Sequence, residues 1–187
     1  MKAINLISLV LFAFAFIASA DDLKSQKIQP KPGQESVWDY PRPPKTEKTS
    51  KQIRIIYDGV LIAKSDRAVR VLQHGHPPVY YIPQEDIQMK FLIPSAKTST
   101  CEFKGTASYY DIKSKTKENK NAAWTYPNPS PGYEMIRDYV AFYPKFMDAC
   151  YVNNERVLPE LDEYFGGWVT HEIVGPFEGS SLDHCKQ

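Results

Sequence analysis

The sequence predicts a mainly β protein folded as a single antiparallel domain, with one short helix near residues 131–142. Two observations predict this fold class. Runs that alternate polar with β-branched or aromatic residues recur along the chain, and hairpin turn signals, glycines and prolines separate them. No internal repeat or second domain is evident, and many short strands with one short helix are typical of a β-rich domain.

The first half of the domain is predicted to be a series of short strands. Residues 52–56 alternate polar and β-branched side chains. Asp58-Gly59 is a hairpin turn signal, because both central positions of such a turn must accept positive φ. The returning strand and the later strand candidates are residues 60–63, 68–72, 79–82 and 88–93.

A longer strand is expected at residues 98–110. On a single strand, Cys101 and Gly105 would share one face, whereas Glu102 and Lys104 would share the other. Gly105 in the middle of a strand indicates a bulge or a close approach by another segment. Another strand is expected at residues 121–126.

The predicted helix follows Ser130-Pro131. Serine is a favourable helix cap and proline a favourable first helical residue. Three side chains would then share one helix face, those of Tyr133, Ile136 and Val140. After the helix, strands at 149–152 and 156–158 flank a second hairpin signal at Asn153-Asn154, and residues 173–177 are a last extended piece.

Both ends of the chain are predicted to lie outside the domain. Residues 1–20 have a basic start, an apolar run shorter than the ~20 residues of a membrane span, and small residues before Asp21. This pattern predicts a cleaved secretory signal, with a membrane anchor as the alternative. We therefore expect an exported protein, periplasmic or secreted, that has no membrane contact after cleavage.

The sequence predicts four segments along the chain. The signal peptide is residues 1–20, a polar flexible leader is residues 21–36, the β-rich domain is residues 37–179, and a disordered tail is residues 180–187. The prolines after Trp38 make residues 38–44 an extended strap. If this strap lay free, it would suit a protein-interaction module, which is one alternative for the function.

Charge and composition argue against several partners. The chain has 23 lysines and arginines against 22 aspartates and glutamates, and Lys2 leaves with the signal. A neutral chain lacks the basic surface that nucleic acids require, so no nucleic-acid partner is expected. No cofactor is predicted, because the chain has no glycine-rich phosphate loop. His74 and His76 could share one side of a strand, but no set of four ligands is evident, so no metal site is predicted.

Six blocks of the chain, in this order, resemble the family called domain of unknown function 427. They are HPPVYYIPQEDI, CEFKG, AAWTYPNPSPG, AFYP, DACYVNNERV and YFGGWVT, and the resemblance covers residues 35–179. It implies a compact, mostly β domain, described for relatives as a small tent-like barrel. The family is sometimes labelled nucleotidyltransferase-like, but this chain lacks the carboxylate pair that would hold Mg²⁺. Gln73 stands where relatives often have glutamate.

The cysteines leave two readings open. Cys101 and Cys150 both fall in predicted strands, where they could form a disulfide or remain small buried thiols. The resemblance favours free thiols, because the family is largely not a disulfide family. Cys185, in the tail, is expected to be exposed and free.

Three residues are candidates for catalysis. A small enzyme could use His76 together with Glu102 or Cys101, because a thiol or carboxyl group needs a nearby base or acid to act. The same residue types also suit a buried thiol and a surface ion pair between Glu102 and Lys104.

The aromatic residues next to prolines and glycines are the best functional clue. Rigid rings with polar ends can line a shallow pocket for a planar molecule, a cation or a sugar, although rings also fill the core of a small β domain. We expect Trp124, Tyr126 and Trp168 to wall such a pocket, with Tyr81 and His76 at its rim. Lys104 or Glu102 would orient the ligand. The oligomeric state is not predicted.

Overall fold

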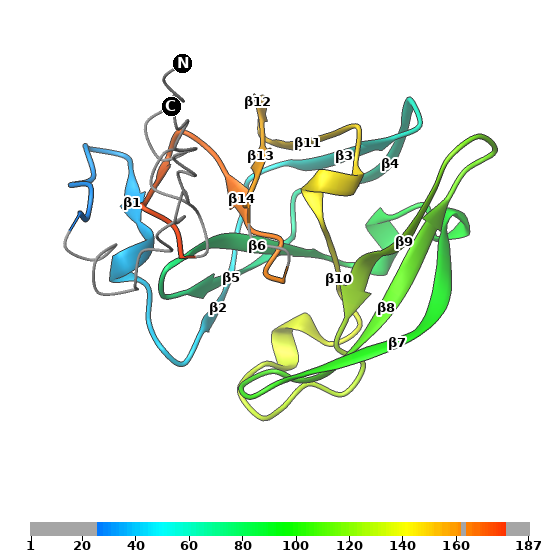
Figure 1. The fold of residues 1–187 in the computed structure, drawn as a ribbon, viewed down its shortest axis with the longest axis horizontal. Helices are drawn as coiled ribbons and strands as arrows, with labels where there is room; N and C mark the ends of the chain where they lie inside the picture. Colours follow the sequence, from blue (N-terminus) through cyan, green and yellow to red (C-terminus); the bar gives the residue numbers. More distant parts are fainter. Residues whose placement is uncertain (1–25, 162–163, 179–187) are drawn as a thin grey trace, which may run out of the picture.

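The structure is a computed structural model that describes residues 26–161 and 164–178. Its strands form a seven-stranded and a four-stranded antiparallel sheet, and the smaller sheet packs over one side of the larger one (Figure 1). The mainly β, antiparallel expectation is confirmed. The expected barrel is wrong, because the strands at the two ends of the larger sheet do not pair with each other. The predicted signal and the whole predicted tail, which includes Cys185, lie outside the described residues.

The larger sheet brings together segments from more than half of the chain. Across it, the strands are β2 (Lys45–Lys48), β5 (Val69–Gln73), β6 (His76–Ile82), β10 (Val140–Phe142), β9 (Glu118–Thr125), β8 (Gly105–Lys113) and β7 (Leu92–Cys101). The short strand β10 is central and pairs with β6 on one side and β9 on the other.

The smaller sheet contains both predicted hairpins. Its strands are β12 (Glu155–Arg156), β11 (Ala149–Val152), β3 (Ile53–Tyr57) and β4 (Val60–Ser65). Asp58 and Gly59 connect β3 to β4 with φ of 50° and 71°, and Asn153 begins the second turn with φ of 55°. Two further pairs are β13 (Leu158–Pro159) with β14 (Trp168–Val169), and β1 (Glu35–Ser36) with β15 (Ile173–Val174); β1 and β15 run parallel.

The helix expected near 131–142 is wrong. The segment forms only a 3₁₀ turn, η4 (Glu134–Ile136), and then becomes strand β10. Asp138 lies between them with a positive φ of 60°, which a helix does not allow. The other 3₁₀ turns of the described residues are η1 (Val37–Asp39), η2 (Gln84–Asp86), η3 (Met89–Phe91) and η5 (Pro144–Phe146). No helix across residues 26–161 and 164–178 has the length and apolar character needed to cross a membrane.

The long strand expected at 98–110 is a hairpin. Strand β7 ends at Cys101, residues 102–104 turn, and Gly105 pairs with Cys101 to begin β8. Gly105 has φ of 92°, and a Cβ atom there would lie 3.1 Å from Ser130 Oγ, so the expected close approach is present. Because Glu102 and Lys104 lie in the turn, they do not share a strand face.

The larger sheet carries side chains on both faces, and each face builds a separate apolar cluster. Successive residues of a strand point to opposite faces. Tyr80 and Phe142 therefore enter the main core between the two sheets, whereas their neighbours Tyr81 and Ala141 enter a second cluster on the outer face. The second cluster holds the candidate site.

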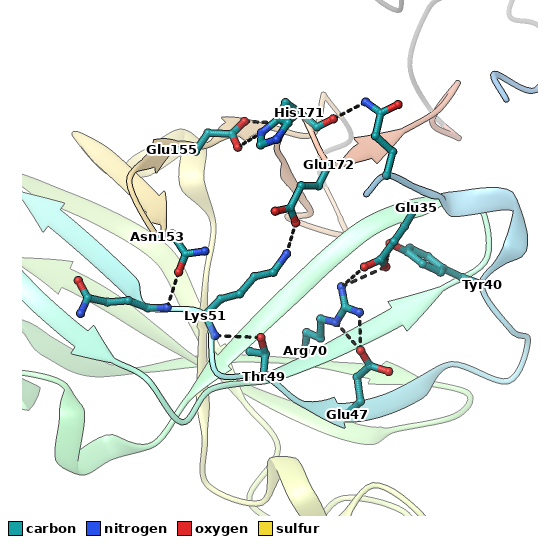
Figure 2. Close-up of polar contacts among 12 residues, drawn as sticks. Glu35, Tyr40, Glu47, Thr49, Lys51, Arg70, Asn153, Glu155, His171 and Glu172 are labelled. Atoms are coloured by element: carbon teal, nitrogen blue, oxygen red, sulfur yellow. Dashed lines mark hydrogen bonds and ion pairs between the residues drawn. The ribbon is translucent and has the colours of Figure 1, made fainter. Parts of the chain in front are cut away.

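The strap is packed against the body and does not lie free. Trp38 and Tyr40 are buried, and the Trp38 indole donates to the carbonyl of Pro176 at 2.8 Å. Residues 26–36, expected within a flexible leader, also contact the body, because Ile28 N–H donates to the carbonyl of Gly175. Figure 2 shows Arg70 joining this segment to the sheet through ion pairs with Glu35 and Glu47.

Candidate functional site

A partly open cavity of about 250 Å³ lies on the outer face of the larger sheet. Rings form much of its wall, and polar groups of the β7–β8 turn and of β5 complete it. Its lining includes Gln73, Tyr81, Cys101, Lys104, Trp124 and Tyr126. No aspartate or glutamate of the described residues lines this cavity.

The register of the sheet explains why the rings meet. Ala141 pairs with Tyr81 on one side and with Trp124 on the other, so the three side chains form one row on the outer face. Val69 and Tyr109 extend the row at its two ends. The methyl group of Ala141 between two large residues leaves room for both rings and for the space above them.

The rings hold one another through polar and edge contacts. The Trp124 indole N–H donates to the Tyr81 hydroxyl at 3.0 Å, and the two rings are nearly perpendicular. Trp124 also packs on Tyr143, with a centroid distance of 4.4 Å. Burial raises the pKa of Tyr81 well above its usual value, and burial, then the nearby Cys101, raises that of Tyr126. Both phenols therefore keep their protons at neutral pH.

Lys104 is the one lysine or arginine among the described residues that line this cavity. The side chain leaves the β7–β8 turn, only 7% of the residue is exposed, and Nζ donates to Gln73 Oε1 over 3.4 Å. Burial lowers the pKa of Lys104, and the nearby Cys101 opposes this only in part. Cys101 is also close enough to the Tyr126 hydroxyl to contribute to its raised pKa, so the cysteine lies near both the amine and the phenol.

His76 borders the cavity, but its ring nitrogens face two carboxylates that the sequence analysis did not consider. Nδ1 lies 2.8 Å from Glu160 Oε1, and Nε2 lies 3.3 Å from Glu178 Oε2. Glu160 is buried and also accepts from the N–H of Gly167, and Phe165 stacks on the imidazole at 3.6 Å. No local sequence signal links His76 to Glu160, because the two are 84 residues apart.

The structure separates the remaining predicted site residues from the cavity. Trp168 is fully buried in the main core beside Tyr80, with its indole donating to the carbonyl of Phe142, so it does not wall the pocket. Glu102 lies on the outside of the turn and pairs with Arg42 at 3.1 Å. This exposed pair borders a second, polar cavity of about 310 Å³, which shares Gln73, His76 and Phe165 with the first.

The expected residues therefore divide into two groups. Tyr81, Lys104, Trp124 and Tyr126 lie together with Cys101, and His76 lies at the edge. Sequence reasoning did not single out Gln73, Tyr109 or Phe165 as members of the wall. Alternation along β8 could have found Tyr109, which lies two residues from the buried Ala107.

Two other chemical features bear on the site. Cys101 and Cys150 are free thiols, with Cys101 at the cavity and Cys150 in the main core. Within the described part of the chain, no group of three or more histidine, cysteine, aspartate or glutamate residues is placed to hold a metal ion.

Comparison with known proteins places the chain in a family. No curated protein matches the chain. A family model matches residues 45–153, which is more than half of the sequence and includes the ring row, Lys104 and the β7–β8 turn. The chain thus belongs to the family described as Domain of unknown function (DUF427).

Proposed function

We propose that this protein binds a small molecule in the ring-lined cavity over β6, β10 and β9, and that it acts after export from the cytoplasm. One observation carries the proposal: rings from several separate segments, among them β6, β8 and β9, converge on a cavity that remains partly open to solvent. Ligand sites are mostly apolar concavities with a few polar groups, usually of about 300–1,000 Å³. A cavity of about 250 Å³ suits a correspondingly small ligand.

The position of the polar groups supports binding over simple core filling. A core would bury rings without a charged neighbour, because an unpaired charge in an apolar site is costly. Here Lys104 lies among the rings, and the Tyr81 hydroxyl, which accepts from Trp124, keeps its own proton available to donate. A small ligand with polar atoms at one end would use both groups.

Two alternatives have weaker support. An enzyme that uses His76 with Glu102 or Cys101 requires these groups to touch, but the ring nitrogens of His76 contact Glu160 and Glu178. An interaction module that docks through residues 40–44 requires a free strap, but Tyr40 is buried and Tyr133 donates to the carbonyl of Pro44.

A thermal-shift screen with a blocked variant tests the proposal. Aromatic acids, aromatic amines and monosaccharides are screened against the wild type and against Val79→Phe, which places a ring in the cavity. We expect at least one class to raise Tm in the wild type and not in Val79→Phe. Leu61→Phe, on the exposed face of β4, is the control and should keep the response. A response unchanged in Val79→Phe, or no response to any class, would contradict the proposal.

A further inference from the structure

We infer that the ligand of this cavity is a small aromatic or otherwise planar carboxylic acid, whose carboxylate pairs with the ammonium group of Lys104. The inference rests on the proposed function and adds the chemical class of the ligand.

The first step is the unusual state of Lys104. Among the lysines and arginines in residues 26–161 and 164–178, Lys104 alone is buried. No carboxylate of these residues lies within ion-pair distance of Nζ, which has only the Gln73 amide oxygen and the Cys101 thiol near it. A buried charge is normally paired, because removing it from water without a partner is costly.

The cavity has a further hydrogen-bond donor besides the Lys104 ammonium group. The Tyr81 hydroxyl accepts from Trp124, and the described residues supply no acceptor for its own proton. The carboxylates nearest to the cavity, Glu160 and Glu178, are engaged by His76. The cavity therefore offers donors, an ammonium and a phenol, which suit an acceptor with negative charge.

The third step is the size and shape of the wall. Tyr81, Trp124 and Tyr126 present ring edges and faces that match a flat apolar group. A cavity of about 250 Å³ with one lysine and no arginine among its described lining residues is too small and too weakly basic for a nucleotide, whose phosphates call for several donors. One carboxylate on a ring or a short planar chain fits both the volume and the single positive charge.

The test compares three probes that share a phenyl ring on a short chain and end in an anionic, a neutral or a cationic group. Phenylacetate, phenylacetamide and phenethylamine are titrated into the mature chain at pH 7 by calorimetry. We expect the acid to bind at least about tenfold more tightly than the amide, the factor of one charge-assisted hydrogen bond, and the amine to bind most weakly.

Variants assign the preference to Lys104. Lys104→Met should bind the acid and the amide equally and keep the wild-type affinity for the amide, and Lys104→Arg should keep a preference for the acid. Lys64→Met, on the exposed face of β4, should behave as the wild type. Proton NMR spectra establish that each variant is folded, and the acid–amide comparison in the wild type needs no variant.

The outcomes separate this inference from the proposed function. If the wild type binds the acid and the amide equally, or prefers the amine, the carboxylate is excluded, although the cavity still binds small molecules. An acid preference that persists in Lys104→Met would likewise overturn the role of Lys104. If none of the three probes binds and the broader screen also finds no ligand, both proposals fail.

Discussion

Arg70 belongs to β5, and Lys104 contacts β5 from the cavity side, but the surroundings of these two cations differ. Arg70 projects away from the cavity and forms ion pairs with Glu35 of β1 and Glu47 of β2, as Figure 2 shows. Lys104 reaches Gln73, on the cavity side of the same strand, and finds an amide in place of a carboxylate. The more buried of the two cations is thus the one that has no anion among the residues the structure describes.

The difference indicates two separate uses of a positive charge. Burial would lower the pKa of Arg70, but hydrogen bonds and charge from Glu35 and Glu47 outweigh it and raise that pKa. Arg70 is satisfied within the chain and ties the N-terminal segment to the sheet. Burial lowers the pKa of Lys104, and the nearby Cys101 opposes this only in part. Because the described residues supply its ammonium group with an amide oxygen and no carboxylate, Lys104 is open to an anionic partner from outside.

The largest expected change in the free energy of unfolding follows from removing Arg70, the cation that forms ion pairs within the chain. Arg70→Met leaves the Glu35 carboxylate without its ion-pair partner and leaves Glu47 with only the exposed Lys45, and we expect the free energy of unfolding to fall by about 2–3 kcal/mol. Urea unfolding of the wild type and the variant at pH 7 measures this loss of stability. Adding Glu47→Gln to Arg70→Met should recover part of the loss. A loss below about 0.5 kcal/mol would show that Arg70 is not a stabilising link.

The strand pattern and the hairpins could be predicted from the sequence, because they depend on local rules. Asp58-Gly59 and Asn153-Asn154 turn where expected, since their backbones accept positive φ. Tyr81, Trp124 and Tyr126 were expected together, and they share the outer face of one sheet.

The remaining features depend on contacts between distant segments. The spacing of residues 133–140 suits a helix, but β10 is held as a strand by β6 and β9 on either side. Alternation continues through the 102–104 turn, so no local pattern marks the end of β7. Likewise, no local feature of Trp168 shows that it packs beside Tyr80 and not beside Tyr81.

Removal of Lys104 is expected to raise the free energy of unfolding, whereas removal of Arg70 lowers it. Lys104→Met removes a buried charge that has no ion-pair partner in residues 26–161 and 164–178, and it keeps a side chain of similar length, so it should raise the free energy of unfolding by about 0.5–2 kcal/mol. Urea unfolding of the ligand-free chain at pH 7 measures this change. Lys64→Met, whose lysine is exposed, should change little. A destabilised Lys104→Met would mean that the chain itself satisfies the ammonium.

The gain from Lys104→Met should also depend on pH. Because the pKa of Lys104 is lowered in the folded state, the unfolded chain binds more protons between this lowered value and the ordinary value of 10.5. Stability of the wild type therefore rises relative to the variant as pH increases through that window. Unfolding of both proteins at pH 7 and at pH 10 should show a smaller difference at pH 10. A difference that stays constant or grows would contradict an abnormal Lys104.

The smallest change in the free energy of unfolding is expected at an ion pair that, like those of Arg70, joins an arginine to a glutamate but is exposed to solvent. Arg42 and Glu102 lie 3.1 Å apart, with 70% and 65% of their side chains exposed. Water screens such a pair, so Arg42→Met should change the free energy of unfolding by less than about 0.5 kcal/mol. Measured beside Arg70→Met, this variant tests whether burial sets the energetic scale. If Arg42→Met cost as much as Arg70→Met, burial would not explain why Arg70 links the segment firmly, and the contrast with Lys104 would lose its physical basis.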